Sequence, residues 1–279
     1  MKTHFKVLKA TGEEQQFLEE KLRDSLIKAG ASEVNVEFVI KEIGKYLHDG
    51  ITTGEIYRKA YQLLRKNVRS NAARYSLKRA IMELGPSGYP FERFIGELLK
   101  KQGYETKVGV IVQGRCVQHE VDVVAQKDTE TVMVECKYHN SPGKFSSVQV
   151  PLYVRSRFND IEAVWQARHE NANRQFQGCL FTNTRFTSDA TDYGICAGLK
   201  LVGWDYPRQG SLKDIIERTA LYPLTVISSL NSKHKQQLLS ANLLLCNELR
   251  DNPGYLDQLS ITSRQKDKTI EELNELCLI

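Results

Sequence analysis

The stretch from residue 117 to residue 137 constrains the fold of this chain more than any other. It contains two runs of apolar, β-branched residues, 117–124 and 131–137, and a short polar segment, 125–130, separates them. Two such runs around a polar turn are typical of a β-hairpin. The sequence therefore predicts a pair of antiparallel strands within an α/β domain.

The predicted hairpin carries three charged residues among its apolar ones. Asp122 lies in the first strand, and Glu135 and Lys137 lie at the end of the second. Side chains two residues apart on a strand share a face, so Glu135 and Lys137 point the same way and Cys136 points away. Buried charges are normally paired or bind metals. This group is therefore the candidate active site.

The composition limits the classes of protein to consider. No run among the 279 residues approaches the roughly 20 apolar residues of a membrane span, so no membrane partner is expected. The start of the sequence has no apolar signal core, which argues against secretion. The six cysteines are scattered without a CxxC pair, which favours a cytoplasmic protein over a zinc or disulfide framework. The net charge of +5 is compatible with a polyanionic partner such as DNA.

The first segment, residues 6–85, has the pattern of a compact, mainly helical unit. Thr52 or Thr53 is a candidate N-cap for a helix predicted over residues 56–68. Apolar residues recur at helical spacing after a short strand-like run at 7–9. The helices predicted on this basis cover residues 17–30, 36–47, 56–68 and 71–84.

The same segment resembles the ATP-cone, the nucleotide-binding regulatory module of ribonucleotide reductases and their repressor. The resemblance is carried by Val7-Leu8-Lys9-Ala10-Thr11-Gly12, Phe17, Lys21-Leu22, Thr53-Gly54-Glu55-Ile56 and Ala73-Arg74-Tyr75. It implies that Lys9 and Lys21 contact the phosphates of ATP or dATP, a role that suits an ammonium. The family usually has Arg-Asp where this chain has Ala10-Thr11. A helical adaptor that has lost the ligand is therefore the alternative.

A turn-forming cluster, residues 85–90, marks the best domain boundary in the chain. After it, residues 91–103 predict an amphipathic helix that carries Glu97, and residues 104–112 predict a strand. The charged hairpin follows directly.

This order, an acidic helix, a strand, an Asp-bearing strand and a Glu-x-Lys strand, resembles that of PD-(D/E)xK nucleases, and of Mrr-like restriction endonucleases in particular. Residues 178–190 and 199–205 are similar to a later strand–turn–helix segment and the closing strand of that group. The resemblance covers about residues 88–206. It implies a type IV restriction-like deoxyribonuclease that uses Mg²⁺ or Mn²⁺ and acts on DNA.

In such a site Asp122 and Glu135 would bind the metal, with the backbone carbonyl of Cys136 as a further oxygen ligand. Lys137 would orient or activate the attacking water and offset charge at the phosphate. Glu97 resembles the acidic residue on the helix of the family, which holds a second metal or its water. The alternative is an Asp–Lys–Glu ion-pair network on an exposed sheet face.

Gln149 and Tyr153 have the Gln-x-x-x-Tyr spacing of RecB-type relatives, where these residues steady the catalytic centre and contact DNA. Pro151 lies between them, and proline is tolerated only near the start of a helix. We predict Gln149 as a support residue and leave Tyr153 open between DNA contact and packing. Several cations are candidates for phosphate contacts or for plain solvation: Lys144, Arg155, Arg157, Arg168 and Arg185.

The last segment predicts helices over residues 212–220, 233–251 and 268–276. Residues 243–249 are apolar enough to pack on the nuclease domain or in a homo-oligomer. We therefore predict an α/β protein with three parts: an ATP-cone-like domain at 1–85, an Mrr-like endonuclease domain with a mixed sheet at 86–206, and a helical C-terminal region at 207–279. A catalytically inactive, nucleotide-responsive DNA-binding regulator is the alternative function.

Overall fold

The computed structural model describes residues 5–9, 12–67, 69–141, 143–168, 171 and 173–277. They form two compact units, residues 1–80 with 222–279, and residues 81–221. Most of the first predicted domain, 1–85, and most of the last, 207–279, thus fall in one unit, whereas residues 81–85 and 207–221 belong to the other. None of the helices in the described part of the chain has the length and apolarity needed to cross a membrane.

The first unit opens with a small three-stranded sheet. Strand β1 (Lys6–Leu8) lies between β2 (Glu14–Gln16) and β3 (Ile51–Thr52), antiparallel to β2 and parallel to β3. The helices of this part are α1 (Glu19–Lys28), α2 (Glu33–Gly44), α3 (Thr53–Asn67) and α4 (Arg69–Tyr75). The first three predicted helices are confirmed, although Val68 lies outside the described residues. The fourth is divided at Ser76, after which α5 (Leu77–Met82) begins.

Helical spacing explains the core of this part. Ile56, Ala60 and Leu64 recur every four residues on α3 and are almost fully buried. The predicted cap of α3 is Thr52: its hydroxyl oxygen accepts from the backbone N–H of Glu55 at 3.1 Å, and the Glu55 carboxylate accepts from the backbone N–H of Thr52 at 2.9 Å. This reciprocal pair fixes the start of the helix.

The C-terminal segment of the first unit packs with its N-terminal helices. It consists of η2 (Leu224–Val226), α10 (Ser232–Ser240), α11 (Cys246–Asp251), η3 (Pro253–Gln258) and α12 (Ser263–Leu276). The hydroxyl of Thr225 donates to the carbonyl of Ala80 at 2.7 Å. The buried carboxylate of Glu272 accepts from the backbone N–H groups of Ser228 and Ser229 at 2.6 and 2.9 Å. The two bonds to Glu272 tie α12 to the loop before α10.

The prediction of one helix over residues 233–251 is wrong. Asn242 takes a φ of 68°, which asparagine tolerates better than most residues, and this ends α10. The turn carries Leu243, Leu244 and Leu245 into the interior, where each is at most 5% exposed. Apolar runs in this segment therefore serve the core.

The second unit is built on a five-stranded mixed sheet in the order β10-β8-β6-β5-β4. Its strands are β4 (Glu105–Gln113), β5 (Gln118–Lys127), β6 (Glu130–Lys137), β8 (Gln175–Thr182) and β10 (Lys200–Val202). The first three are antiparallel neighbours, whereas β8 runs parallel to β6 and to β10. A separate parallel pair is formed by β7 (Phe145–Ser146) and β9 (Arg185–Phe186). The predicted hairpin and mixed sheet are confirmed.

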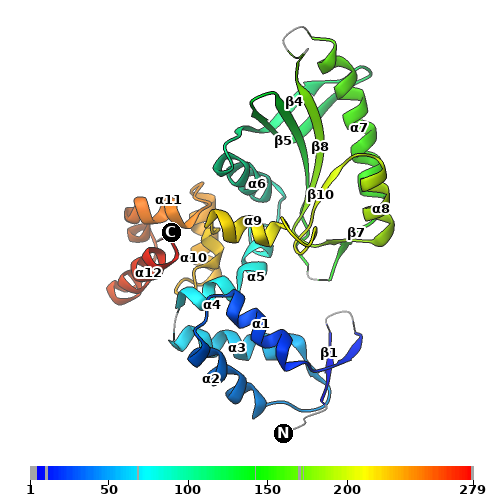
Figure 1. The fold of residues 1–279 in the computed structure, drawn as a ribbon. Helices are drawn as coiled ribbons and strands as arrows, with labels where there is room; N and C mark the ends of the chain where they lie inside the picture. Colours follow the sequence, from blue (N-terminus) through cyan, green and yellow to red (C-terminus); the bar gives the residue numbers. More distant parts are fainter. Residues whose placement is uncertain are drawn as a thin grey trace. The chain divides into compact units, whose positions relative to one another are not determined.

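Helices cover both faces of this sheet (Figure 1). Helix α6 (Tyr89–Lys101) packs on one face, where Gly96 approaches Val108 and Val123. Helices α7 (Gln149–Gln166) and α8 (Ser188–Cys196) cover the other, and α7 buries Phe158 and Ile161 there. Helix α9 (Leu212–Thr219) completes the unit. The architecture is a three-layer α/β sandwich.

Candidate functional site

The charged residues of the hairpin meet where β6 ends. The antiparallel register pairs Val123 with Val134, and one further step along it sets Asp122 opposite Glu135. Opposite residues of an antiparallel pair share a face, and Lys137 lies on that face two residues after Glu135. The structure therefore places Asp122, Glu135 and Lys137 on one side of the sheet, the side covered by α7.

Asp122 is fixed by the neighbouring strand. One of its carboxylate oxygens accepts from the backbone N–H of Cys136 at 2.6 Å. Burial raises the pKa of Asp122 above its ordinary value, although this hydrogen bond and the charge of Arg157 act in the opposite direction. The carboxylate is thus rigid and poorly compensated. The thiol of Cys136 points to the other face of the sheet, so its backbone carbonyl is the group available to a metal.

Glu135 has a cationic partner from α7. The Nη1 atom of Arg157 lies 2.6 Å from Oε2 of Glu135, and Nη2 of the same guanidinium donates to the backbone carbonyl of Glu120. Burial, followed by the charge of Asp122, nevertheless raises the pKa of Glu135 to about 7. The site therefore holds more negative charge than Arg157 and Lys137 offset.

A third carboxylate comes from α6, and it is Glu92. Burial raises the pKa of Glu92 to about 7, with further contributions from the charges of Asp122, Glu120 and Glu135. The preceding residue, Phe91, is fully buried, and its ring lies 5.7 Å from that of Tyr138, just beyond the end of β6. This aromatic contact brings the first turn of α6 to the strand end that carries Glu135.

Glu97, the helical carboxylate expected from the sequence, lies on another side of α6. Five residues separate it from Glu92, which is a rotation of ~140° about the helix axis. Its carboxylate lies 3.7 Å from the ammonium of Lys100 in a partly exposed i,i+3 pair. The structure therefore brings Glu92, and not Glu97, together with Asp122 and Glu135.

Lys137 differs from the carboxylates in being exposed. Its backbone carbonyl accepts from the hydroxyl of Thr182 at 2.8 Å, which fixes the strand position. No carboxylate within the described part of the chain lies in salt-bridge distance of its ammonium, although its charge acts on both Asp122 and Glu135.

Gln149 opens α7 and is exposed, and no hydrogen bond joins it to the carboxylates within the described residues. Pro151 falls in the first turn of the helix, where proline is tolerated. The guanidinium of Arg157 lies 5.2 Å from the ring centroid of Tyr153, four residues earlier on the same face. The position of Arg157, four residues after Tyr153, was thus the sequence signal that could have placed its side chain on the face of α7 that meets the hairpin.

The strand that carries Asp122 is anchored by a second α7 residue that the sequence did not single out. Asp160 accepts from the ring of His119 at 2.8 Å and from the backbone N–H of Cys116 at 2.8 Å. The hydrogen bond from His119 lowers the pKa of Asp160 to about 2. This pair fastens the start of β5 to α7 and so positions the site.

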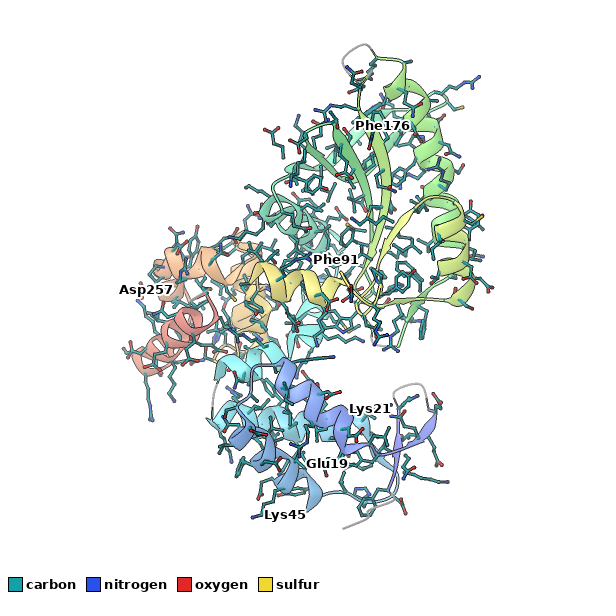
Figure 2. The ribbon with its side chains drawn as sticks, in the orientation of Figure 1. Glu19, Lys21, Lys45, Phe91, Phe176 and Asp257 are labelled. Atoms are coloured by element: carbon teal, nitrogen blue, oxygen red, sulfur yellow. The ribbon has the colours of Figure 1, made fainter. Side chains whose placement is uncertain are left out.

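The two lysines that the ATP-cone resemblance assigns to nucleotide binding lie in the first unit. The ammonium of Lys9 is 2.8 Å from the carboxylate of Glu13. Lys21 is exposed in the first turn of α1, two residues after Glu19 (Figure 2). Ala10 and Thr11, where the sequence departs from the ATP-cone pattern, lie outside the described residues.

The chemistry of the site suits a divalent cation. Glu92, Asp122 and Glu135 all have a pKa above the ordinary value, chiefly because each is partly buried, and the charges of neighbouring carboxylates add to this. A bound dication would relieve this repulsion. No group of three or more His, Cys, Asp or Glu side chains in the described ranges is placed so that it could hold a metal ion. A metal at this strand end would therefore rest on one or two of these carboxylates and on water, as Mg²⁺ usually does.

Comparisons with known proteins define the class of the second unit. Residues 85–205 match the restriction endonuclease family (Mrr_cat), and residues 222–277 match the family described as AF1548-like, C-terminal. The chain therefore contains a restriction endonuclease domain, and the expected Mrr-like resemblance is confirmed for this part.

Two relatives are each similar to about two thirds of this chain. An uncharacterized protein of Archaeoglobus fulgidus is 37% identical over 183 residues, 65% of this chain and 99% of the relative. The crystal structure of AF1548, a protein of unknown function, is 32% identical and covers 68% of this chain and 98% of its own, with a TM-score of 0.54. The chain belongs to the AF1548-like family.

A restriction endonuclease, MspJI, is similar over 53% of this chain and 32% of its own, with 15% identity and a TM-score of 0.35. Residues 1–84 lie outside both matched family regions. The ATP-cone resemblance therefore stays a prediction.

Proposed function

We propose that this protein is a metal-dependent DNA endonuclease. The observation that carries the proposal is that Asp122, Glu135 and Lys137 share one face at the end of β6 in a restriction endonuclease domain, where the charges of Asp122 and Glu135 also act on Glu92. Hydrolysis of a phosphodiester needs an attacking water, and it needs positive charge to balance the phosphate as the bond to the sugar oxygen breaks. Carboxylates that would hold a metal beside an exposed ammonium meet both needs.

Asp122 and Glu135 would hold Mg²⁺ or Mn²⁺, together with the carbonyl of Cys136, and Glu92 would bind it directly or through water. The ion would supply Lewis acidity toward water and the phosphate oxygens. Lys137 would orient the attacking water and offset charge at the phosphate. Arg157 holds the carboxylate of Glu135 in place. The type IV restriction-like role implied by the resemblance belongs to this proposal.

A plasmid-cleavage assay tests the proposal. We expect supercoiled DNA to be nicked or linearised with Mg²⁺ or Mn²⁺ but not with EDTA, and Lys137→Ala to lower the rate by roughly 10²–10⁴-fold. Lys101→Ala is a matched control, since Lys101 is an exposed lysine on α6. Cleavage that survives EDTA or Lys137→Ala would refute the assignment.

One observation favours a second function, a DNA-binding regulator that does not cut. Arg157 pairs with Glu135 at 2.6 Å, as in a structural ion pair. A mobility shift of DNA by the wild-type protein without cleavage under any divalent ion would support this alternative. Plasmids with and without methylation, tested in parallel, would prevent a restricted substrate preference from being mistaken for inactivity.

We also infer an adenine nucleotide site at Lys9 and Lys21, supported by the three-stranded sheet that the helices of the first unit follow. Equilibrium dialysis with ATP and dATP tests it. Binding should weaken in Lys9→Gln/Lys21→Gln and persist in Lys28→Gln, because Lys28 is an exposed lysine at the other end of α1. Equal binding by both variants, or none by the wild type, would leave this part of the chain a helical adaptor.

A further inference from the structure

A groove in the first unit gathers positive charge that the proposed cleavage chemistry does not use. It lies between α3 and α12 and has a cavity volume of about 710 Å³. Within the described part of the chain its lining contains no carboxylate. Five of its lining residues are cationic, Lys59, Arg65, Lys66, Arg264 and Lys268.

Helical spacing explains why these cations converge. Lys59 and Lys66 are seven residues apart, two turns of α3, so their side chains emerge on the same face of that helix. Arg264 and Lys268 are four residues apart on α12 and share a face there. The sequence pattern is therefore the source of a basic wall on each side of the groove.

Most of these cations have no acidic partner. Arg65, Lys66, Arg264 and Lys268 have no carboxylate oxygen within 4.0 Å among the residues that the structure describes. In contrast, Lys266 on the same helix pairs with Asp257. Like charges gathered in a concave surface repel one another and attract anions. Within the described residues, these four cations of the groove therefore lack the carboxylate partner that Lys266 has.

The wall of the groove is fixed from behind. The side-chain amide of Gln265 donates to the carbonyl of Ser229 at 2.7 Å, and Thr262 caps α12 by accepting from the backbone N–H of Gln265 at 3.2 Å. Glu272 is buried on the same helix, and its carboxylate accepts hydrogen bonds from the backbone N–H groups of Ser228 and Ser229. An anion would thus meet a preformed surface.

The neutral lining residues indicate which anion fits. They are Gln62, Leu63, Ser229, Thr262 and Gln265, and no aromatic ring for stacking a base is among the described lining residues. Amides and hydroxyls beside Lys and Arg are the groups that contact phosphate and sugar oxygens. We propose that this groove binds the phosphate backbone of double-stranded DNA, as a contact separate from the cleavage site. The choice of DNA rests on the proposed endonuclease function.

Binding of a DNA duplex of about 30 base pairs, measured by fluorescence anisotropy in EDTA over roughly 50–300 mM salt, tests the proposal. The test variant is Lys66→Gln/Arg264→Gln/Lys268→Gln. The control, Lys28→Gln/Lys41→Gln/Lys233→Gln, removes the same charge from exposed positions elsewhere in the same unit. Far-UV circular dichroism checks that both variants fold.

We expect the groove variant to bind about 10–100-fold more weakly near 100 mM salt, with a salt slope smaller by about 2.7, which is ~0.9 for each lost contact. The control should bind as the wild type does. DNA should also protect Lys66 and Lys268 from chemical acetylation and leave Lys28 and Lys41 reactive. Equal affinities and slopes for the two variants, or no protection, would overturn the proposal.

Two further arms separate the alternatives. Titration calorimetry with ATP and with inorganic triphosphate shows whether the groove takes a free phosphate ligand. If the groove variant no longer binds ATP but binds DNA as the wild type does, the DNA assignment is overturned. The binding assay in EDTA is independent of cleavage. Groove-dependent DNA binding without metal-dependent cutting would therefore refute the endonuclease proposal and leave the groove proposal standing.

Discussion

The guanidinium of Arg157 lies 2.6 Å from the carboxylate of Glu135 and also donates to the backbone of Glu120. One α7 side chain therefore supports both strands of the hairpin at the point where the candidate site is formed. Neither partner is well exposed, at 11% for Arg157 and 18% for Glu135, so the pair is shielded from most solvent screening.

Arg157→Ala should destabilise the second unit by about 1–3 kcal/mol in EDTA, because Glu135 and the Glu120 carbonyl lose their donor. Urea denaturation followed by tryptophan fluorescence measures this, since both tryptophans, Trp165 and Trp204, belong to that unit. Mg²⁺ should recover part of the loss. The control is Arg155→Ala, whose more exposed pair with Glu162 spans 3.6 Å. Losses of equal size in the two variants would contradict the role of Arg157.

Glu92 and Glu97 give a matched pair of substitutions on one helix. Glu92→Gln should lower Mg²⁺- or Mn²⁺-dependent cleavage by roughly 10–100-fold, as loss of a metal ligand or of a group that positions one does. Glu97→Gln should change it little, because Glu97 pairs with Lys100 away from the site. Initial rates at saturating metal, with the metal affinity measured in parallel, decide between them. The reverse result would restore the choice made from the sequence.

The hairpin shows what the sequence could predict. Period-two alternation alone sets Glu135 and Lys137 on one face and Cys136 on the other. Whether Asp122 shares that face depends on the register of the two strands, and a slip of one residue would reverse it. The register is set by the turn after Lys127, where Asp128 takes a φ of 47°. The motif resemblance supplied what periodicity could not.

Two features of the structure could not be predicted from local pattern, because they depend on contacts between residues distant in sequence. The choice between Glu92 and Glu97 depends on Phe91 packing against Tyr138, and helical periodicity does not reveal which flank of α6 meets β6. The bond from Thr225 to Ala80 spans 145 residues and joins the C-terminal helices to the N-terminal ones. Local pattern treats those two segments as separate domains.

Gly178 allows α7 to approach the sheet. A Cβ at this position would lie 2.6 Å from the ring of Phe158 and 2.8 Å from the side chain of Leu199. Gly178→Ala should therefore cost about 1–3 kcal/mol of unfolding free energy in the second unit, again followed by tryptophan fluorescence. Phe158→Leu in the same chain should make the alanine less costly, because the ring that it meets is gone. Additive losses in the double variant would show that the two side chains do not meet.

The pH dependence of stability tests the charge of the site itself. Glu92 and Glu135 have a pKa near 7 in the folded protein, raised by burial from the ordinary value of 4.5, and the pKa of Asp122 is raised too. Between pH 4.5 and 7 the folded state therefore binds more protons than the unfolded state, so the stability of the metal-free protein falls as pH rises through this window. Asp160 has the opposite shift, but its contribution is lost only below its ordinary pKa of 3.8.

We expect urea denaturation in EDTA to show a lower unfolding free energy for the second unit at pH 8 than at pH 5.5. Glu92→Gln/Glu135→Gln should flatten this profile, because the double variant removes the two carboxyls whose pKa is raised the most. Mg²⁺ should oppose the fall, since it binds the deprotonated carboxylates, and its binding near pH 7 should release about one proton, measured by calorimetry in buffers of different ionisation enthalpy. Stability that rises from pH 5.5 to 8 in EDTA, or metal binding without proton release, would mean that these carboxylates are already ionised and compensated, and that the cluster is a structural ion-pair network.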